Sequence, residues 1–268
     1  MTPNSASTVR PPAVAGLFYP AEADSLARTV SDLLADVAAA GRDVPKAVIA
    51  PHAGYVYSGP IAAHAYAPLA AGRGTITRVV LLGPTHRAAV RGLAIPLARA
   101  FATPLGTIEL DQAAIESIRG LPQVVTSDEA HAMEHSLEVH LPFLQQVLGD
   151  FKLVPLAVGS AEPREVAAVI EALWGGPETL IVVSSDLSHY LRYAEAKAVD
   201  RDTCDAVLAL RTDIDHEQAC GATPVAGLAL VARHKALRPE LLDLRNSGDT
   251  AGDKSRVVGY ASFAFYER

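Results

Sequence analysis

The segment KAVIAPHAGYVYSG, residues 46–59, decides how the rest of the sequence is interpreted. Its apolar run, Ala47–Ala50, is typical of a buried strand, and Pro51 ends it because proline lacks the N–H that a strand ladder needs. His52 follows directly after this break. The segment therefore predicts a buried strand that carries a histidine at its C-terminal end.

The same order of features occurs twice more along the chain. VVLLGPTH at residues 79–86 and LIVVSSDLSHY at residues 180–190 each join a short apolar run to a histidine, His86 and His189. Runs this short and continuous are expected of parallel strands that helices cover on both faces. Because ligands of such sheets bind beyond the carboxyl ends of the strands, we expect the three histidines to share one site.

The remaining pattern predicts an α/β/α sandwich with a central, largely parallel or mixed sheet. We expect a flexible tail over residues 1–12 and a single α/β domain over residues 13–268. Thr223 and Pro224 make a good helix start, since threonine caps a helix and proline is tolerated in its first turn. Helices are expected at 22–40, 60–71, 111–119, 136–148, 162–174, 194–211 and 223–234, and further strands at 92–96, 106–110, 151–159, 241–245 and 257–265.

Composition argues against several classes of partner. The chain has 268 residues, half of them hydrophobic, which is enough for a large core. A net charge of −7 without a block of Lys or Arg argues against nucleic acid and against an anionic membrane surface. No apolar run approaches the ~20 residues of a membrane span, and no secretory signal is evident. Two cysteines are too few for a disulfide framework, so we expect a cytoplasmic location.

A single histidine after a strand is usually a hydrogen-bonded loop residue, whereas three at matched positions favour a shared metal site. Neutral imidazole binds Fe, Zn, Cu and Ni, so histidine alone does not select the ion. Asp186 and His189 are three residues apart, and one turn would let the carboxylate orient the imidazole. That arrangement suits a general base or a residue behind a metal ligand equally well. The simpler alternative for Asp186 is a cap of the following helix.

Cys220 lies in ACGATP, just before the helix expected at 223–234. The helix dipole and its free N–H groups favour an anion there, which predicts a lowered pKa for the thiol. A thiolate in this place could bind a metal or attack a substrate. The alternative is a small buried residue, because Ala and Gly flank it. Cys204, inside a predicted helix, is interpreted as structural.

The segment HAMEHSLEVH, residues 131–140, begins with the H-x-x-E-H pattern, in which two histidines bind zinc and the glutamate activates water. That chemistry needs a continuous helix through residues 131–135, whereas Ser136 is more typical of a helix start. We therefore predict that this is not a zinc-protease site. Instead, we expect the crevice to be lined from the helix side by Glu134, His135, Glu138 and His140.

Five motifs in register resemble the Memo family, whose bacterial and archaeal members are called AmmeMemoRadiSam system protein B. The motifs are PHAGY at 51–55, GPTH at 83–86, EHSLEVHLPF at 134–143, SSDLSHY at 184–190 and CGxxP at 220–224. AGLFYP at 15–20 also resembles the opening segment of that family. The resemblance extends over nearly the whole chain. It implies an α/β/α fold similar to the class III non-heme iron extradiol dioxygenases.

For the site, the resemblance implies a metal-binding set, a catalytic pair beside it and a pocket wall. Ring-cleaving dioxygenases complete their iron site with a carboxylate, and a cysteine in that place shifts the preference toward softer metals. Catechol cleavage is therefore not implied. The metal-binding set implied by the resemblance is His52, His86 and Cys220. The catalytic pair is Asp186 and His189, and the pocket wall includes Tyr55 and Phe18.

Two function classes stay open. The first is a redox or dioxygenase-like metalloenzyme that uses a divalent or redox-active metal ion, with Fe(II) favoured over Cu or Zn. The second is a non-enzymatic metal-binding or partner-binding protein that keeps the pocket, and a zinc-dependent hydrolase is a weaker third. Expected partners are a small-molecule or peptide ligand in the pocket and, from the resemblance, AMMECR1-like and radical SAM proteins.

Overall fold

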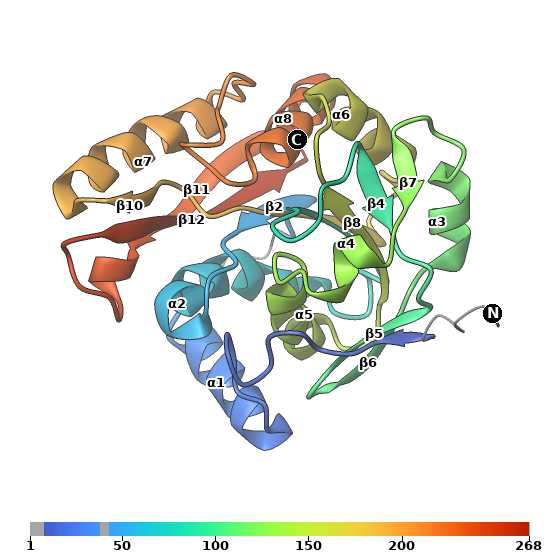
Figure 1. Cartoon of the computed structure of the whole chain (residues 1–268), viewed down its shortest axis with the longest axis horizontal. Coiled ribbons are helices and arrows are strands. Elements are labelled where there is room, and N and C mark those ends of the chain that lie inside the picture. Colours follow the sequence, from blue (N-terminus) through green and yellow to red (C-terminus); the bar gives the residue numbers. More distant parts are fainter. Residues whose placement is uncertain (1–7, 38–42, 268) are drawn as a thin grey trace.

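The computed structural model describes residues 8–37 and 43–267 (Figure 1). In order, strands β1 to β12 are Val9–Arg10, Ala47–Ala50, Arg78–Pro84, Leu93–Ile95, Ala100–Thr103, Gly106–Glu109, Val124–Thr126, Lys152–Val158, Thr179–Ser184, His189–Leu191, Arg238–Asn246 and Val257–Tyr266. Helices α1 to α8 are Ala23–Ala35, Tyr55–Tyr66, Gln112–Ile118, Glu129–Ala132, Leu141–Leu148, Pro163–Ala172, Tyr193–Leu208 and Ala222–His234. Short 3-10 helices η1 to η3 are Ala67–Gly72, Glu138–His140 and Ser247–Asp249.

A nine-stranded mixed sheet forms the centre of the described part of the chain. Its order is β10-β12-β2-β9-β3-β8-β4-β7, and β11 also pairs with β12. β2, β9, β3 and β8 are parallel neighbours, while β12 and β4 run antiparallel beside them. Every residue of β2 and β9 is buried, which explains their unbroken apolar sequences. The predicted α/β class with a mixed sheet is confirmed.

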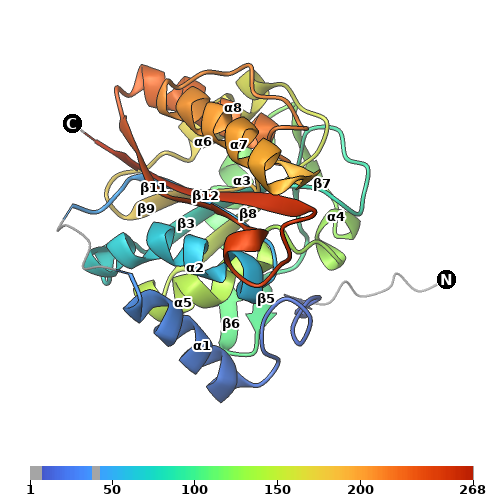
Figure 2. The ribbon, with the colours of Figure 1, turned by 90° about the vertical axis from the view of Figure 1, so that its left-hand side faces the viewer.

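Helices cover both faces of this sheet (Figure 2). α2 contacts β2, β11 and β12 on one face and packs there with α1 and α5. On the other face α8 contacts β3 and β9, α7 contacts β11 and β12, and α6 packs on α8. The three layers match the predicted α/β/α sandwich. No helix within the described ranges is both long and apolar enough to cross a membrane.

The strands that precede the sequence-predicted site lie side by side. β9 pairs in parallel with β2 on one side and with β3 on the other. Ala50 is opposite Ser184, and Leu82 is opposite Val183, so the three strands end at the same edge. The prediction that these strand ends meet along one edge of a single sheet is therefore confirmed.

More of the N-terminal segment is part of the folded structure than the sequence predicts. β1 pairs in parallel with β5 in a second, three-stranded sheet of order β1-β5-β6, and Arg10 is buried. The predicted end of a flexible tail at residue 12 is therefore wrong. Residues 1–7 of that tail lie outside the described residues. So do residues 38–42, which include the expected end of the helix at 22–40.

Candidate metal centre

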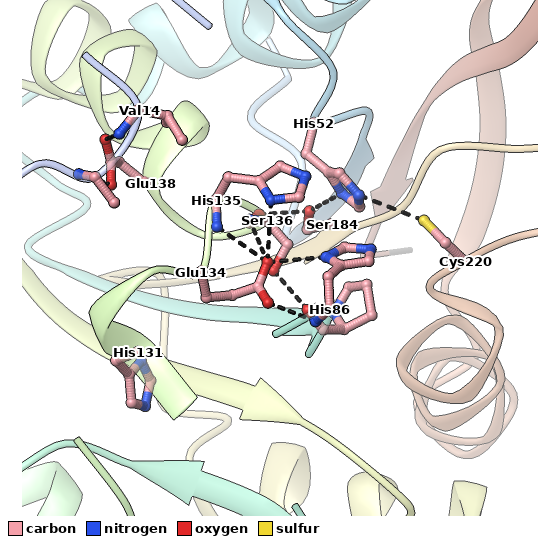
Figure 3. A network of polar contacts seen from close by, with 12 residues as sticks. Val14, His52, His86, His131, Glu134, His135, Ser136, Glu138, Ser184 and Cys220 are labelled. Atoms are coloured by element: carbon pink, nitrogen blue, oxygen red, sulfur yellow. Dashed lines mark hydrogen bonds and ion pairs between the residues drawn. The ribbon is translucent and has the colours of Figure 1, made fainter. Parts of the chain in front are cut away.

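His52, His86 and Cys220 converge beyond the ends of β2 and β3 (Figure 3). One ligand atom of each side chain lies within 4.8 Å of the other two, and His52 Nε2 is 3.4 Å from Cys220 Sγ. The two imidazole rings have centroids 5.2 Å apart. A metal with bonds of about 2.0–2.3 Å to nitrogen and sulfur brings its ligand atoms to separations of this size. The donor set and its spacing therefore fit one metal ion.

The loop that carries Cys220 approaches the end of β9 closely because residue 221 is a glycine. A Cβ on Gly221 would lie 2.5 Å from the Ser184 carbonyl oxygen and 2.6 Å from Ser185 Cβ. The Cys220 sulfur accepts a hydrogen bond from the backbone N–H of Asp186 at 3.3 Å. Glycine at this position is thus what allows the thiol to reach the histidines.

Cys220 has a raised pKa, so the predicted lowering is wrong. Burial, followed by the nearby Asp186 carboxylate, raises the pKa of the thiol to about 12. The N-terminus of α8 would stabilise a thiolate by only ~0.3–1 kcal/mol, which is too little to offset the cost of burying that charge. Without a bound cation, Cys220 is a thiol at neutral pH.

Glu134 fixes the orientation of His86. Its carboxylate accepts hydrogen bonds from the His86 backbone N–H at 2.5 Å, from His86 Nδ1 at 2.9 Å, and from the N–H groups of His135 and Ser136 at 3.0 Å. Burial alone would raise the pKa of Glu134, but the hydrogen bonds from His86 bring it to about 2. A carboxylate can only accept, so His86 Nδ1 carries the proton and Nε2 is free to bind a metal.

His135 lies beside the cluster, as predicted. Its ring stacks on His86 with centroids 4.7 Å apart, and burial lowers its pKa to about 4. Ligand atoms of His86, Glu134 and His135 also lie within 4.8 Å of one another. Because Glu134 already accepts four hydrogen bonds, we assign it to the support of His86 and not to a second metal position.

A pocket of about 880 Å³ opens over His86 and Cys220. Its wall continues through Arg91 and His216, while His52 is buried and does not line the pocket. His86 is exposed on the pocket side. A small ligand can therefore approach the three donor atoms from the side of His86.

Tyr55 and Phe18 lie outside the wall of this pocket, which corrects their predicted role. Both line a separate hollow of about 460 Å³. Tyr55 is buried, and its hydroxyl donates to the Val139 carbonyl at 2.7 Å. Phe18 reaches the cluster only through His135, with ring centroids 4.8 Å apart.

Asp186 and His189 do not form the predicted pair. Residues 186–188 are irregular and not a helical turn, and the Asp186 carboxylate accepts from the backbone N–H of His52 at 2.7 Å. Burial raises the pKa of Asp186 to about 7, although the His52 N–H opposes the shift. His189 lies in the edge strand β10, where partial burial of its ring and the nearby His86 lower its pKa. Asp186 therefore positions His52, while His189 lies near the cluster without that carboxylate as a partner.

Glu138 anchors the N-terminal segment, and its predicted place on the crevice wall is wrong. The buried carboxylate accepts from the Arg10 guanidinium, from the N–H groups of Ala13 and Val14 at 2.8 and 2.9 Å, and from the Tyr19 hydroxyl at 2.5 Å. These partners hold the chain that leads into α1. Glu138 is therefore a structural residue.

Glu138→Ala is expected to destabilise the fold by about 3–5 kcal/mol, because it leaves the Arg10 charge buried and unpaired. Urea unfolding followed by circular dichroism measures the change. Glu116→Ala is the matched control, since its ion pair with Arg119 is exposed and worth no more than ~1 kcal/mol. Equal destabilisation by the two substitutions would contradict the assignment.

His140 is also buried and does not line the pocket. Its Nδ1 lies 2.5 Å from the Tyr66 hydroxyl, and its Nε2 lies 2.7 Å from Ser184 Oγ. Burial lowers its pKa to about 3, so the imidazole is neutral at ordinary pH. The predicted position of His140 at the crevice is wrong, but its partner Ser184 also contacts His52.

The H-x-x-E-H segment does not form a zinc site. α4 ends at Ala132, and Met133 has left the helical conformation with φ −116°. His131 is buried and lies apart from the cluster (Figure 3). Its Nε2 is 2.9 Å from the Ala94 carbonyl, and its ring packs against Phe101. This arrangement agrees with the prediction that residues 131–135 are not a protease site.

Sequence reasoning overlooked Ser184, which touches both His52 and His140. A usable signal was present, because Ser184 is the first polar residue after the apolar run LIVV. A hydroxyl at the inner end of a wholly buried strand needs a hydrogen-bond partner. Such a residue next to a predicted site is a candidate for positioning a metal-binding side chain.

Comparison with known proteins gives one consistent family. Residues 10–264 match the family model described as Memo-like protein. The "MEMO1 family protein" of Ignicoccus hospitalis is 36% identical over 285 residues, covering 96% of this chain and 98% of the relative. That of Aquifex aeolicus is 36% identical over 269 residues, with 96% and 99% covered. That of Methanosarcina acetivorans is 38% identical over 271 residues, with 95% and 98% covered. An uncharacterized Escherichia coli K12 protein of known crystal structure aligns with a TM-score of 0.49 and 15% identity, over 81% of this chain and 98% of its own.

Proposed function

The chain belongs to the Memo family of Memo-like proteins, and on this premise we propose that it binds a metal ion through His52, His86 and Cys220. The observation that carries the proposal is the convergence of their three ligand atoms within 4.8 Å. The Nδ1 atoms of both histidines are engaged by other side chains. Each ring therefore has its Nε2 available to bind the metal ion.

The donor set fits a borderline or redox-active ion. Imidazole suits Fe, Cu and Zn, and a thiolate favours the softer members of that series. We propose Fe(II) as the first choice from the family resemblance, with Cu or Zn as alternatives. Such an ion, when bound, supplies Lewis-acid or one-electron redox chemistry.

The chain's own residues have distinct parts in this proposal. Glu134 orients His86, and Asp186 holds the backbone of His52. The pocket over His86 and Cys220 would admit a small molecule or a peptide side chain. His189 is not part of that pocket wall, but its lowered pKa keeps it neutral near His86, and it would accept a proton from a ligand held at the metal position. On this basis we propose a redox or dioxygenase-like metalloenzyme.

A second candidate is a non-enzymatic metal-binding or partner-binding protein. It is favoured by the direction of the Asp186 carboxylate, which accepts from the His52 N–H. No hydrogen bond or ion pair joins Asp186 to His189 among the described residues, so His189 lacks the partner expected of an oriented base. Metal analysis of anaerobically purified protein, paired with oxygen consumption, separates the two. AMMECR1-like and radical SAM partners stay predictions from the family resemblance.

His189→Ala is expected to keep the metal content of the wild type while lowering oxygen consumption of the Fe(II)-loaded protein by about 100-fold, the lower end of general-base effects. The exposed His234, paired with Glu171, gives the control variant His234→Ala, which should change neither quantity. Loss of metal from His189→Ala equal to that from His52→Ala would make His189 a ligand. Wild-type protein that binds metal without consuming oxygen would favour the non-enzymatic candidate.

A further inference from the structure

Behind His52, buried side chains form a hydrogen-bonded chain that ends at Tyr66. Ser184 Oγ lies 2.6 Å from His52 Nδ1, 2.7 Å from His140 Nε2 and 2.6 Å from the Ser136 carbonyl oxygen. The other nitrogen of His140, Nδ1, lies 2.5 Å from the Tyr66 hydroxyl. His52, His140, Ser184 and Tyr66 are each at most 2% exposed. Solvent therefore does not compete for these hydrogen bonds.

The three neighbours of Ser184 determine where its single proton points. The Ser136 carbonyl can only accept, so a proton directed elsewhere would leave two oxygens 2.6 Å apart with lone pairs facing each other. A buried acceptor without a hydrogen-bond donor lowers the stability of the folded state by ~1–3 kcal/mol. Ser184 therefore donates to Ser136. Its two lone pairs are then left for N–H groups of His52 and His140.

We propose that Ser184 is a tautomer lock for the metal site, an inference that rests on the proposed function. By accepting from His52 Nδ1–H, it leaves His52 Nε2 without a proton, and this atom is 3.4 Å from Cys220 Sγ. His52 is thus set in the metal-binding tautomer before an ion arrives. Ser184 is a positioning residue, since it acts through His52.

His140 and Tyr66 complete the lock. Because His140 donates from Nε2 to Ser184, its Nδ1 must accept, and the Tyr66 hydroxyl supplies the proton. Each donor in the chain then has one acceptor. His86 is set in the same tautomer by a carboxylate, Glu134, whereas His52 is set by a neutral hydroxyl. The lock therefore orients His52 without placing a further charge under the site.

Ser184→Ala tests the lock, and Ser262→Ala is its matched control. Ser262 is likewise a fully buried serine in a sheet strand whose hydroxyl donates to a backbone carbonyl, that of Ile61, and not to a histidine. We expect Ser184→Ala to weaken Fe(II) or Zn binding by about 10–100-fold, the usual effect of losing a partner behind a metal ligand. Ser262→Ala should bind as the wild type does. Equal affinity in Ser184→Ala and the wild type would overturn the proposal.

The direct readout is NMR of isotope-labelled histidine ring nitrogens in the metal-free protein, with the His52 signals identified by their loss in His52→Gln. The wild type should show a protonated Nδ1 and an unprotonated Nε2 at His52, and Ser184→Ala should show a mixture of tautomers. An unprotonated Nδ1 in the wild type, or an unchanged tautomer in Ser184→Ala, would overturn the lock. Failure of the wild type to bind any metal would instead remove the proposed function, while the ring signals would still decide the tautomer.

Discussion

His52→Ala is expected to leave the protein unable to retain a metal ion through purification. Site energies of about 10–16 kcal/mol in four-ligand zinc peptides correspond to roughly 2.5–4 kcal/mol per ligand, so the loss of one should weaken binding by about a hundredfold or more. The alanine also removes the partner of Ser184 and opens a cavity beside Cys220. Elemental analysis after anaerobic purification, followed by competition with a chelator, measures both content and affinity.

His131→Gln is the control for this experiment. His131 lies outside the cluster, and glutamine can keep a hydrogen bond to the Ala94 carbonyl. We expect this variant to hold metal as the wild type does. A zinc site built on H-x-x-E-H would give the reverse pattern, with binding lost in His131→Gln and kept in His52→Ala.

Metal uptake is expected to release one proton from Cys220 and to tighten about tenfold for each unit rise in pH between about 7 and 9. The direction of this pH dependence follows from the pKa of about 12 for the metal-free thiol, which keeps the sulfur protonated throughout that range. A bound ion needs the thiolate, so the proton must leave and rising pH favours binding. Asp186, with a pKa of about 7, is half ionised at pH 7 and largely ionised above pH 8, so the slope between pH 8 and 9 reports Cys220.

Chelator competition at several pH values gives this slope, and calorimetry in buffers of different ionisation enthalpy counts the protons. Cys220→Ser is the matched variant, because a serine hydroxyl keeps the size of the side chain without a proton that a metal readily displaces. The metal affinity of Cys220→Ser should be about a hundredfold or more below that of the wild type, by the same energy per ligand. This affinity should also be independent of pH in this range. Wild-type binding without proton release would mean that Cys220 is not a ligand.

The frame of the site was predictable because it depends on local pattern. The apolar runs that became β2, β3 and β9 are too short for helices and carry no exposed face, so burial in a parallel sheet was the consistent interpretation. Element boundaries were less predictable. α2 begins at Tyr55, not at residue 60, so Pro60 lies inside the helix where a first-turn proline was expected.

The contacts within the site were less predictable because they join residues far apart in the chain. Nothing near Glu138 in sequence indicates Arg10 as its partner, and only the fold brings them together. The pKa of Cys220 depends on how deeply its loop is buried, which a short motif does not specify. The three-residue spacing of Asp186 and His189 suggested a helical turn, but the chain there is irregular and leads into β10.

X-ray absorption of the metal-loaded protein tests the central claim most directly. A site made by His52, His86 and Cys220 predicts two imidazole nitrogens at about 2.0–2.1 Å and one sulfur at about 2.3 Å from the ion, distances given for zinc. The sulfur contribution should disappear in Cys220→Ser, while the imidazole contribution stays. A wild-type spectrum with nitrogen and oxygen ligands alone would contradict the account.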